Sequence, residues 1–377
     1  MKVLRTIESF LPKVTGPARQ AWSISENLEK IGWSSPVVTT YMDVDGHLPR
    51  QETLGRVAVT RLPVAFRIMR YAVSPGMGAH LRRCDLIHSH NYRNFQTDYA
   101  YWRGHGRRPF ILSTHGSLLG FQHYLPQGPA RWPYRLYDAL TLKAAVKGAD
   151  AVVVSSPLEY EDGVRFGAPS GKIRIIPMGI DVDTLSPARH ENGPRPLRLL
   201  FAGRIARVRR VERILQAVKQ LQTPWELVVV GGEEKTSSVT RSGYLAELNR
   251  LTADLGITDR VRFEGPRTPE ALANYYQNAD VFLYASQYEN FGQPLLEAAA
   301  HGVPLVSTPV GAARELIRPG ETGFLVDDDP ATMARRIEDL QPPAVRREFG
   351  AALRTLVRDQ FGWSAIMDQY LDLYRKV

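Results

Sequence analysis

Short apolar runs rich in Val and Ile alternate with amphipathic segments along the whole chain, and this alternation limits the fold more than any other feature. Strand-like runs such as Val3–Ile7 and Ala151–Ser155 are each followed by a stretch with helical spacing. The second half repeats the pattern, with runs such as Leu197–Ala202 and Val281–Tyr284. Alternating strands and helices produce βαβ units around a mainly parallel sheet. The predicted fold class is therefore α/β, with two Rossmann-like domains.

A polar, proline-rich segment, Ser186–Pro196, separates the two halves and is typical of a linker. The 377 residues are long enough for two domains, which we expect over 1–185 and 197–358. Residues 361–377 have apolar side chains at helical spacing and predict an amphipathic helix that needs a surface to pack on. Because ligands bind at the carboxyl ends of strands in such sheets, we expect the functional motifs just after strands, in a cleft between the domains.

Positive charge is concentrated in the first half. Residues 1–183 hold 23 Lys and Arg against 15 Asp and Glu, whereas residues 184–377 hold 25 against 24. The basic half suits an anionic membrane surface or an anionic acceptor, and it shows no recognised nucleic-acid-binding module. Phe66–Tyr71 lies inside the helical pattern Val64–Arg83, which is broken by Pro75-Gly76, and it mixes apolar and basic residues as an interfacial helix does. We predict peripheral binding to anionic lipid; the alternative is a basic surface that only covers the rim of a core.

Several classes of protein are excluded by what the sequence lacks. A single cysteine, Cys84, rules out an internal disulfide and a cysteine-rich zinc site and favours a reducing compartment. The sequence has no apolar run of about 18 residues, and the first residues are too polar for a signal peptide. Neither G-x-G-x-x-G nor the P-loop pattern occurs, which counts against dehydrogenases and P-loop NTPases. We expect a cytoplasmic protein that associates peripherally with the inner face of the cell membrane.

An arginine-rich turn follows the first strand of the second half. Gly203 allows a tight turn, and Arg204 and Arg209 lie near the start of the next predicted helix. A helix start attracts anions, and two guanidiniums suit a diphosphate because each grips oxygens with two N–H groups. The alternative is a solvated basic helix start, since Arg207 and Arg210 lie in the same turn.

Two glutamates frame the loop after the strand Val281–Tyr284. Glu289 lies in the loop, and Glu297 lies about one turn into the helix that follows Pro294. A carboxylate accepts hydrogen bonds from two neighbouring sugar hydroxyls, so one glutamate can hold a hexose and the other a ribose. The alternative is a capping glutamate and a surface glutamate.

Histidines mark two strand ends in the first half. His115 follows the strand Phe110–Thr114 and precedes Gly116, so it should face a ligand at the carboxyl end of the sheet, unless it is an ordinary loop histidine. His88 and His90 resemble a metal-binding pair, but no third ligand lies at nearby spacing, so we predict no metal. Gly16, between Thr15 and Pro17 at a helix start, is a weak phosphate-type turn.

The ordered set of motifs resembles the retaining glycosyltransferases of family 4, which have the GT-B fold. The resemblance rests on Ile175-Ile-Pro-Met-Gly-Ile-Asp181, Phe201-Ala-Gly-Arg204, Ala279-Asp-Val-Phe-Leu283 and Glu289 to Glu297, and it is strongest over residues 149–327. It implies two Rossmann-like domains with a cleft between them and a C-terminal helix that crosses back to the first domain.

The resemblance also implies roles for individual residues. Arg204 and Arg209 would bind the donor diphosphate, Glu289 the transferred sugar and Glu297 the ribose. His115 would lie beside the sugar, so the implied catalytic residues are His115, Arg204, Arg209 and Glu289. The implied donor-binding residues are Gly16, Arg204, Arg209, Arg267 near the base, Glu289, Asn290, Phe291, Gly292, Gln293, Leu295 and Glu297.

Two departures from the family pattern affect this site. Arg209-Arg210 stands where the family usually has Lys-Gly, and Thr15-Gly16-Pro17 replaces the usual Gly-Gly of the first loop. Arginine keeps the positive charge but is bulkier than an ammonium, and Pro17 has no N–H to donate.

The sequence therefore predicts a retaining hexosyltransferase that uses a nucleoside-diphosphate sugar, a UDP-sugar ahead of GDP-mannose. The acceptor would be lipid-linked or anionic, in glycan or glycolipid biosynthesis, and no metal or other cofactor is expected. Two alternatives stay open: a sugar-nucleotide epimerase of the same architecture, and a non-catalytic, membrane-associated subunit that binds sugar nucleotides.

Overall fold

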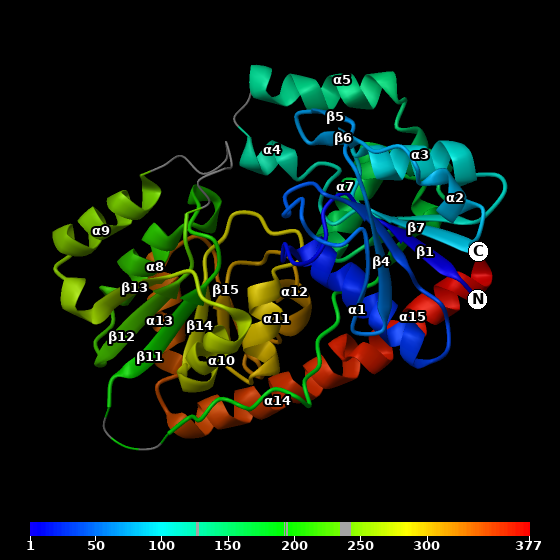
Figure 1. Cartoon of the computed structure of the whole chain (residues 1–377). Helices are drawn as coiled ribbons and strands as arrows, with labels where there is room; N and C mark the ends of the chain where they lie inside the picture. The colour runs from blue at the N-terminus through cyan, green and yellow to red at the C-terminus, as the bar shows by residue number, and fades with distance from the viewer. Residues whose placement is uncertain (126–127, 192, 194, 234–242) are drawn as a thin grey trace. The chain divides into compact units, whose positions relative to one another are not determined.

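The computed structural model describes all residues except 126–127, 192, 194 and 234–242, and the chain divides into two compact units (Figure 1). Unit 1 is Met1–Gly179 with Trp363–Val377, and unit 2 is Ile180–Gly362. The segment expected to be a linker belongs to unit 2. The Ala188 N–H donates to the His301 carbonyl at 2.7 Å, and the Ile180 N–H donates to the Phe361 carbonyl at 2.9 Å. These hydrogen bonds place the division a few residues before the proline-rich stretch.

Within the described part of unit 1, an eight-stranded sheet runs in the order β10-β9-β8-β7-β1-β2-β4-β3, and only β3 is antiparallel to its neighbour. Its strands are β1 (Val3–Thr6), β2 (Val37–Thr40), β3 (Gln51–Leu54), β4 (Val57–Leu62), β7 (Leu86–His90), β8 (Phe110–Ser113), β9 (Ala151–Val154) and β10 (Ile173–Ile175). Its helices are α1 (Gly16–Lys30), α2 (Gly78–Leu81), α3 (Phe95–Gly104), α4 (Phe121–Tyr124), α5 (Trp132–Leu140), α6 (Ala144–Gly148), α7 (Pro157–Phe166) and α15 (Trp363–Lys376). The strand order reverses beside β1, which is where α/β sheets place their ligands.

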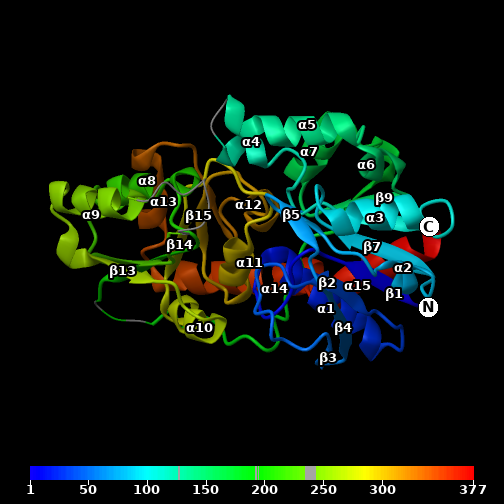
Figure 2. The same cartoon turned by 45° about the horizontal axis from the view of Figure 1, so that its top comes forward.

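The sheet of unit 1 is covered by helices on both faces (Figures 1 and 2). On one face α1 and α15 bury a core that includes Val3, Leu86, Ile366 and Tyr370. On the other face α3, α6 and α7 cover Leu4 and its neighbours. Strand side chains alternate between the faces, so Val3 and Leu4 enter different cores. The predicted C-terminal helix is confirmed, and it packs on the first domain.

In the helical pattern Val64–Arg83, the part before the break at Pro75-Gly76 is not helical, and the part after it contains the short helix α2. β5 (Phe66–Ile68) and β6 (Tyr71–Val73) form an antiparallel hairpin that turns at Met69, whose φ is +55°. The Tyr71 hydroxyl donates to Asp98 at 2.8 Å, and the Tyr137 hydroxyl of α5 donates to the same carboxylate at 2.6 Å. Tertiary hydrogen bonds thus hold the hairpin beside α5. The predicted interfacial helix at Phe66–Tyr71 is therefore wrong.

The described part of unit 2 has a six-stranded parallel sheet in the order β13-β12-β11-β14-β15-β16. Its strands are β11 (Leu197–Ala202), β12 (Trp225–Val230), β13 (Val261–Gly265), β14 (Val281–Tyr284), β15 (Leu305–Ser307) and β16 (Gly323–Leu325). Its helices are α8 (Val211–Val218), α9 (Tyr244–Asp254), α10 (Pro269–Asn278), α11 (Gln293–Ala300), α12 (Ala313–Leu316), α13 (Pro330–Asp339) and α14 (Pro343–Phe361). Helices α8, α9 and α13 lie on one face, and α10, α11 and α14 on the other (Figures 1 and 2).

Both units are Rossmann-like, which confirms the predicted fold class. In the described ranges of the chain, no helix is both long enough and apolar enough to cross a bilayer.

Candidate functional site

The two motif loops of unit 2 follow neighbouring strands at the point where the strand order reverses. β11 precedes the arginine-rich turn and β14 precedes the glutamate loop, and these strands pair in parallel. The loops are also joined directly, because the Gln287 N–H and the Ser286 hydroxyl donate to the Val208 carbonyl at 2.8 and 3.0 Å. The two main motifs therefore lie side by side at the carboxyl ends of β11 and β14, where α/β sheets bind their ligands.

Arg209, Glu289 and Tyr284 form a charged cluster that is almost shielded from solvent. The Arg209 guanidinium forms an ion pair with Glu289. The Tyr284 hydroxyl donates to Glu289 at 2.6 Å and accepts from the guanidinium at 2.6 Å. Burial raises the pKa of Tyr284, although the charges of Arg209 and Arg204 oppose that shift. The phenol therefore stays protonated and serves as a fixed hydrogen-bond donor to the carboxylate.

Arg209 also has a donor with no acceptor in the described structure. Its Nε–H is buried and finds no hydrogen-bond partner among the described residues. A buried donor without an acceptor is costly, so such a group suits a ligand oxygen. Arg204 is exposed in the same turn, and its charge acts on Tyr284. Arg204 and Arg209, which are predicted to bind the same diphosphate, therefore both lie in the turn after β11, near Tyr284.

Gly292 ends the glutamate loop and lets α11 begin. Its φ is +87°, a conformation that favours glycine. One turn into α11, Glu297 accepts hydrogen bonds from the Gln293 amide at 3.0 Å and from the Tyr276 hydroxyl at 3.1 Å. Gln293 and Glu297 therefore present paired polar groups at the helix start.

Other predicted residues of this loop belong to the core. The side chains of Phe291 and Leu295 are buried, at 3% and 0% exposure. The Phe291 carbonyl accepts from the Ala312 N–H at 2.6 Å. Asn290 lies between Glu289 and Phe291 and is half-buried. Phe291 and Leu295 therefore shape the loop rather than present polar side chains.

Arg267 lies outside this cluster. It follows β13, which is two strands away from β11 in the sheet. Its guanidinium contacts Glu264 at 2.7 Å and the Tyr275 hydroxyl at 3.3 Å. It is exposed, so this pairing leaves it accessible to a ligand at the sheet edge.

In unit 1, His115 lies in a strained turn after β8. Its φ is +48°, and Gly116 follows at +76°. The buried carboxylate of Glu159 holds this turn by accepting from the Thr114 hydroxyl at 2.5 Å and from the Gly116 N–H. The same carboxylate accepts from the N–H and hydroxyl of Ser155 at 2.7 and 2.8 Å. A non-glycine residue in this conformation persists only where its surroundings fix it, as Glu159 does here.

Gly16 is the first residue of α1, which follows β1, the strand beside which the strand order of unit 1 reverses. Thr15 caps the helix, because its hydroxyl accepts from the Ala18 N–H at 3.2 Å. Pro17 occupies the first turn, where its missing N–H costs little.

Sequence reasoning missed a polar pair beside the reversal in unit 1. Asn91, just after β7, donates to both carboxylate oxygens of Glu8, at 2.9 and 3.2 Å. Burial raises the pKa of Glu8. Both residues follow parallel strands, so the rule that ligands bind at carboxyl ends could have found them.

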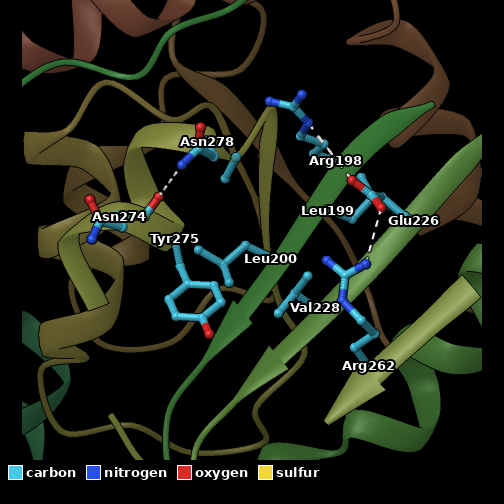
Figure 3. Close-up of a pocket in the computed structure, with 10 residues that line it drawn as sticks. Arg198, Leu199, Leu200, Glu226, Val228, Arg262, Asn274, Tyr275 and Asn278 are labelled. Carbon is cyan, nitrogen blue, oxygen red and sulfur yellow. Dashed lines mark hydrogen bonds and ion pairs between the residues drawn. The ribbon is translucent and has the colours of Figure 1, made fainter. Parts of the chain in front are cut away.

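A pocket of about 330 Å³ lies on the α10 side of the unit 2 sheet (Figure 3). Leu200 and Val228 form its floor, and Arg198, Glu226 and Arg262 form a charged row across three strands. These charges pair with one another, since Arg262 lies 3.4 Å from Glu226 and Arg198 lies 3.7 Å from it. No predicted site residue lines this pocket.

Comparisons with known proteins agree with the fold and the motifs. Residues 14–184 match the family described as Glycosyltransferase Family 4, and residues 184–344 match Glycosyl transferases group 1. The chain is 30% identical over 312 residues to the D-inositol 3-phosphate glycosyltransferase of Thermomonospora curvata, which covers 77% of this chain and 71% of that protein.

Solved structures share the fold along the whole chain. A sucrose-phosphate synthase from Thermosynechococcus elongatus has a TM-score of 0.78 at 24% identity, and the match covers 100% of this chain and 99% of that one. Anabaena HepE, in complex with UDP and glucose, has a TM-score of 0.75 at 18% identity, with 100% of both chains covered. With these matches, the motifs and the two Rossmann-like units, the chain belongs to glycosyltransferase family 4 and is a glycosyltransferase.

Proposed function

We propose that this glycosyltransferase moves a hexosyl unit from a nucleoside-diphosphate sugar to an anionic or lipid-linked acceptor, with retention of configuration. A UDP-sugar is proposed ahead of GDP-mannose. The fold-level likeness to a structure that holds UDP supports the nucleotide, and the relatives named for inositol 3-phosphate support an anionic acceptor. The observation that carries the proposal is the buried Arg209 Nε–H next to Glu289, for which the described part of the chain offers no acceptor.

The donor would bind unit 2. Arg204 and Arg209 would grip the diphosphate, Glu289 would accept from the sugar hydroxyls, and Glu297 would accept from the ribose. Asn290, Gln293 and backbone N–H groups near Gly292 would complete the donor contacts, with Arg267 near the base. The Tyr284 hydroxyl supports this arrangement, because it fixes the carboxylate and the guanidinium before any ligand arrives.

The chemistry would rest on charge stabilisation. The bond from the anomeric carbon to the diphosphate oxygen breaks, and the anomeric carbon bonds to the acceptor hydroxyl oxygen on the same face. The hydroxyl proton passes to the departing diphosphate. Negative charge grows on the diphosphate in this step, and two guanidiniums at one place stabilise it. We therefore propose that the reaction needs no metal ion.

His115 and Gly16 belong to the proposed site in unit 1. His115 would hydrogen-bond the sugar, and the Gly16 N–H would lie by a phosphate or the acceptor. The contacts of Glu159 with Thr114 and Gly116 support this role, because they hold the backbone turn that carries His115, and the imidazole itself contacts His90 at 2.9 Å.

We also propose that unit 1 binds anionic membrane. On α5 the side chains of Trp132, Leu136 and Leu140 lie at i, i+4 and i+8 and are 67%, 60% and 75% exposed. Phe66, Ile68 and Met69 are exposed on the neighbouring β5–β6 hairpin, and basic residues, including Arg67 and Arg135, accompany both elements. Exposed apolar side chains among arginines suit an interface with acidic headgroups.

Donor binding is tested by a thermal-shift panel of UDP, UDP-glucose, UDP-galactose and GDP-mannose, because a bound ligand raises the melting temperature. Arg207, in the same arginine-rich turn as Arg204, provides a matched control. Arg204→Ala should abolish the shift and the transfer, whereas Arg207→Ala should keep both, since Arg207 is held by Glu247 outside the cluster. Undiminished turnover in Arg204→Ala would contradict the proposal.

Incubation with donor alone separates the alternatives. A transferase converts the donor to a new glycoside only when a lipid extract or an inositol phosphate is added, whereas an epimerase converts it without any acceptor. A non-catalytic subunit would show the thermal shift and no product in either incubation.

Vesicle flotation tests the membrane proposal. Leu136→Glu should weaken binding to vesicles that contain phosphatidylglycerol at low salt. Ile31→Glu is the control, because Ile31 is 52% exposed at the end of α1, away from α5 and the hairpin. Equal flotation with neutral and anionic vesicles would contradict the proposal.

A further inference from the structure

Among the residues that the structure describes, a buried arginine in unit 1 has only neutral hydrogen-bond partners. Arg5 is 0% exposed, in the middle of β1. Its guanidinium contacts the Ser25 hydroxyl at 2.9 Å, His88 Nδ1 at 3.0 Å, His90 Nε2 at 3.3 Å and the Tyr374 hydroxyl at 2.9 Å. Burying a charge costs free energy unless its N–H groups donate hydrogen bonds, so the buried guanidinium of Arg5 depends on these four contacts.

The contacts continue from Arg5 to the proposed site. His88 and His90 project from the same face of β7, and the parallel register puts Arg5 beside His88. His90 Nδ1 lies 2.9 Å from His115 Nε2. The three imidazoles are stacked, with centroids 4.7 Å apart for His88 and His90 and 5.2 Å for His90 and His115. The stacked rings of His88, His90 and His115 therefore form a continuous row that connects Arg5 to the turn after β8.

The rings are neutral near pH 7. Burial lowers the pKa of His88 and His90 well below the ordinary histidine value, and the neighbouring positive charge of Arg5 adds to this. Burial also lowers the pKa of His115, to about 3. A neutral imidazole has one N–H donor and one acceptor nitrogen, so each ring must hold one of two tautomers.

Arg5 determines the tautomer of His90, because a guanidinium can donate hydrogen bonds but cannot accept them. His90 Nε2 must accept from Arg5, which leaves the hydrogen of His90 on Nδ1. That Nδ1–H then donates to His115 Nε2, which leaves the hydrogen of His115 on Nδ1. The contacts of His88 agree with this assignment. Its Nδ1 lies 3.0 Å from Arg5 Nη1 and 2.8 Å from the Tyr374 hydroxyl, which accepts from Arg5 and so donates its own proton to Nδ1. The Nε2–H of His88 then donates to the Ser113 hydroxyl at 2.7 Å.

We propose that Arg5 and His90 are positioning residues that hold His115 in the Nδ1–H tautomer, so that His115 offers a hydrogen-bond donor to a sugar or acceptor oxygen. His115 Nε2 is occupied by His90, so it is not available as a base. The part of this inference that concerns catalysis rests on the proposed role of His115 in sugar transfer. The assignment of the His115 tautomer does not depend on that role.

The tautomer is tested by ¹⁵N NMR of the full chain labelled at histidine, in which the two ring nitrogens give distinct shifts. His115→Asn identifies the His115 signals. The wild type should show a protonated Nδ1 and an accepting Nε2. A protonated Nε2 at His115 would overturn the proposal.

Variants test whether the tautomer depends on the row of rings. His90→Phe keeps the ring but removes the donor, so His115 should shift towards the Nε2–H form. Arg5→Met should do the same if it folds, whereas Arg5→Lys keeps a donor and should keep the tautomer. Ser25→Ala is the matched control, because Ser25 contacts Arg5 outside the path to His115. An unchanged His115 tautomer in folded His90→Phe would overturn the proposal.

Kinetics test the part of the inference that concerns catalysis. His90→Phe should lower kcat about tenfold, the loss expected for one misdirected hydrogen bond, and change KM for the nucleotide sugar less than about twofold. If the spectra are as expected but His115→Asn keeps the wild-type kcat, the role of His115 is overturned while the tautomer assignment stands. If the wild type transfers no sugar from any donor, the proposed function fails, and the spectra still decide the tautomer.

Discussion

Arg209 and Glu289 form an ion pair that is 7% and 8% exposed and that joins the loops after β11 and β14. The pair has a structural role besides any role in binding. Because the Tyr284 hydroxyl contacts both partners, the two motifs of the second domain are held together through three side chains.

Arg209→Met should lower the free energy of unfolding by about 3–5 kcal/mol, because it leaves the Glu289 carboxylate buried without its partner. The double variant Arg209→Met with Glu289→Gln should recover part of this loss. Urea unfolding measures both. Arg262→Met is the control: its pair with Glu226 is exposed, so the loss should stay below about 1 kcal/mol. Equal losses at the two arginines would show that burial of the pair does not matter.

Glu159→Gln should loosen the turn that carries His115. The carboxylate accepts four hydrogen bonds, and an amide in its place turns one acceptor into a donor that faces other donors. We expect a loss of about 2–4 kcal/mol and faster hydrogen exchange at the Gly116 N–H. Glu161→Gln on the exposed side of α7 is the control and should change neither measurement. Unchanged exchange at Gly116 in Glu159→Gln would contradict the role assigned to Glu159.

Asp280 should make the protein sensitive to acid. Burial alone would raise the pKa of Asp280, but hydrogen bonds from Arg195 and the Arg198 N–H, with the charge of Arg346, bring it below its ordinary value. A lowered pKa in the folded state means that stability is present above the unfolded pKa, about 4, and is lost as pH falls through the folded value.

Melting temperatures from pH 6 to pH 2.5 measure this effect. Asp280→Asn should be less stable than wild type at pH 6, and the difference should shrink as the pH falls below about 4. Asp254→Asn, at an exposed position on α9, should follow the wild-type curve. A difference that stays constant down to pH 2.5 would contradict the expectation.

Gly311 should be intolerant of any side chain. A Cβ there would lie 2.3 Å from the Phe291 carbonyl oxygen, in a residue whose φ is +48°. Gly311→Ala should therefore displace the glutamate loop, cost about 2–4 kcal/mol and weaken UDP-sugar binding. Gly320→Ala separates backbone strain from the clash, because its φ is +82° and nothing lies within 4 Å of the added carbon. It should cost about 1 kcal/mol and leave binding unchanged. Equal costs at the two glycines would contradict the clash.

The sequence was sufficient to predict the two Rossmann-like domains, because strand and helix periodicity are local properties. It also predicted that the loops after β11 and β14 would come together, since topology fixes where strands end. It mispredicted the β5–β6 hairpin, whose amphipathic pattern fits a helix, because the hydrogen bonds that stabilise the hairpin come from Asp98 and are not local.

The role of Arg5 was not predictable for the same reason. In the run Val3-Leu-Arg5-Thr it is a single charged residue in an apolar strand. Ser25 lies 20 residues away, but the partners that connect Arg5 to His115 and to α15 lie 83 to 369 residues away and meet it through the register of β1 with β7 and the packing of α15. Pairings over such distances depend on the whole fold.

The position of α15 has a consequence for how a nascent chain folds. The side chains that cover Val3, Leu86 and Arg5 come from residues 363–377, which are synthesised after all of unit 2. Until they emerge from the ribosome, the domain made first keeps one face of its sheet partly uncovered. This face of unit 1 is therefore completed only after residues 363–377 have been synthesised, so the first domain cannot finish folding before the second has been made.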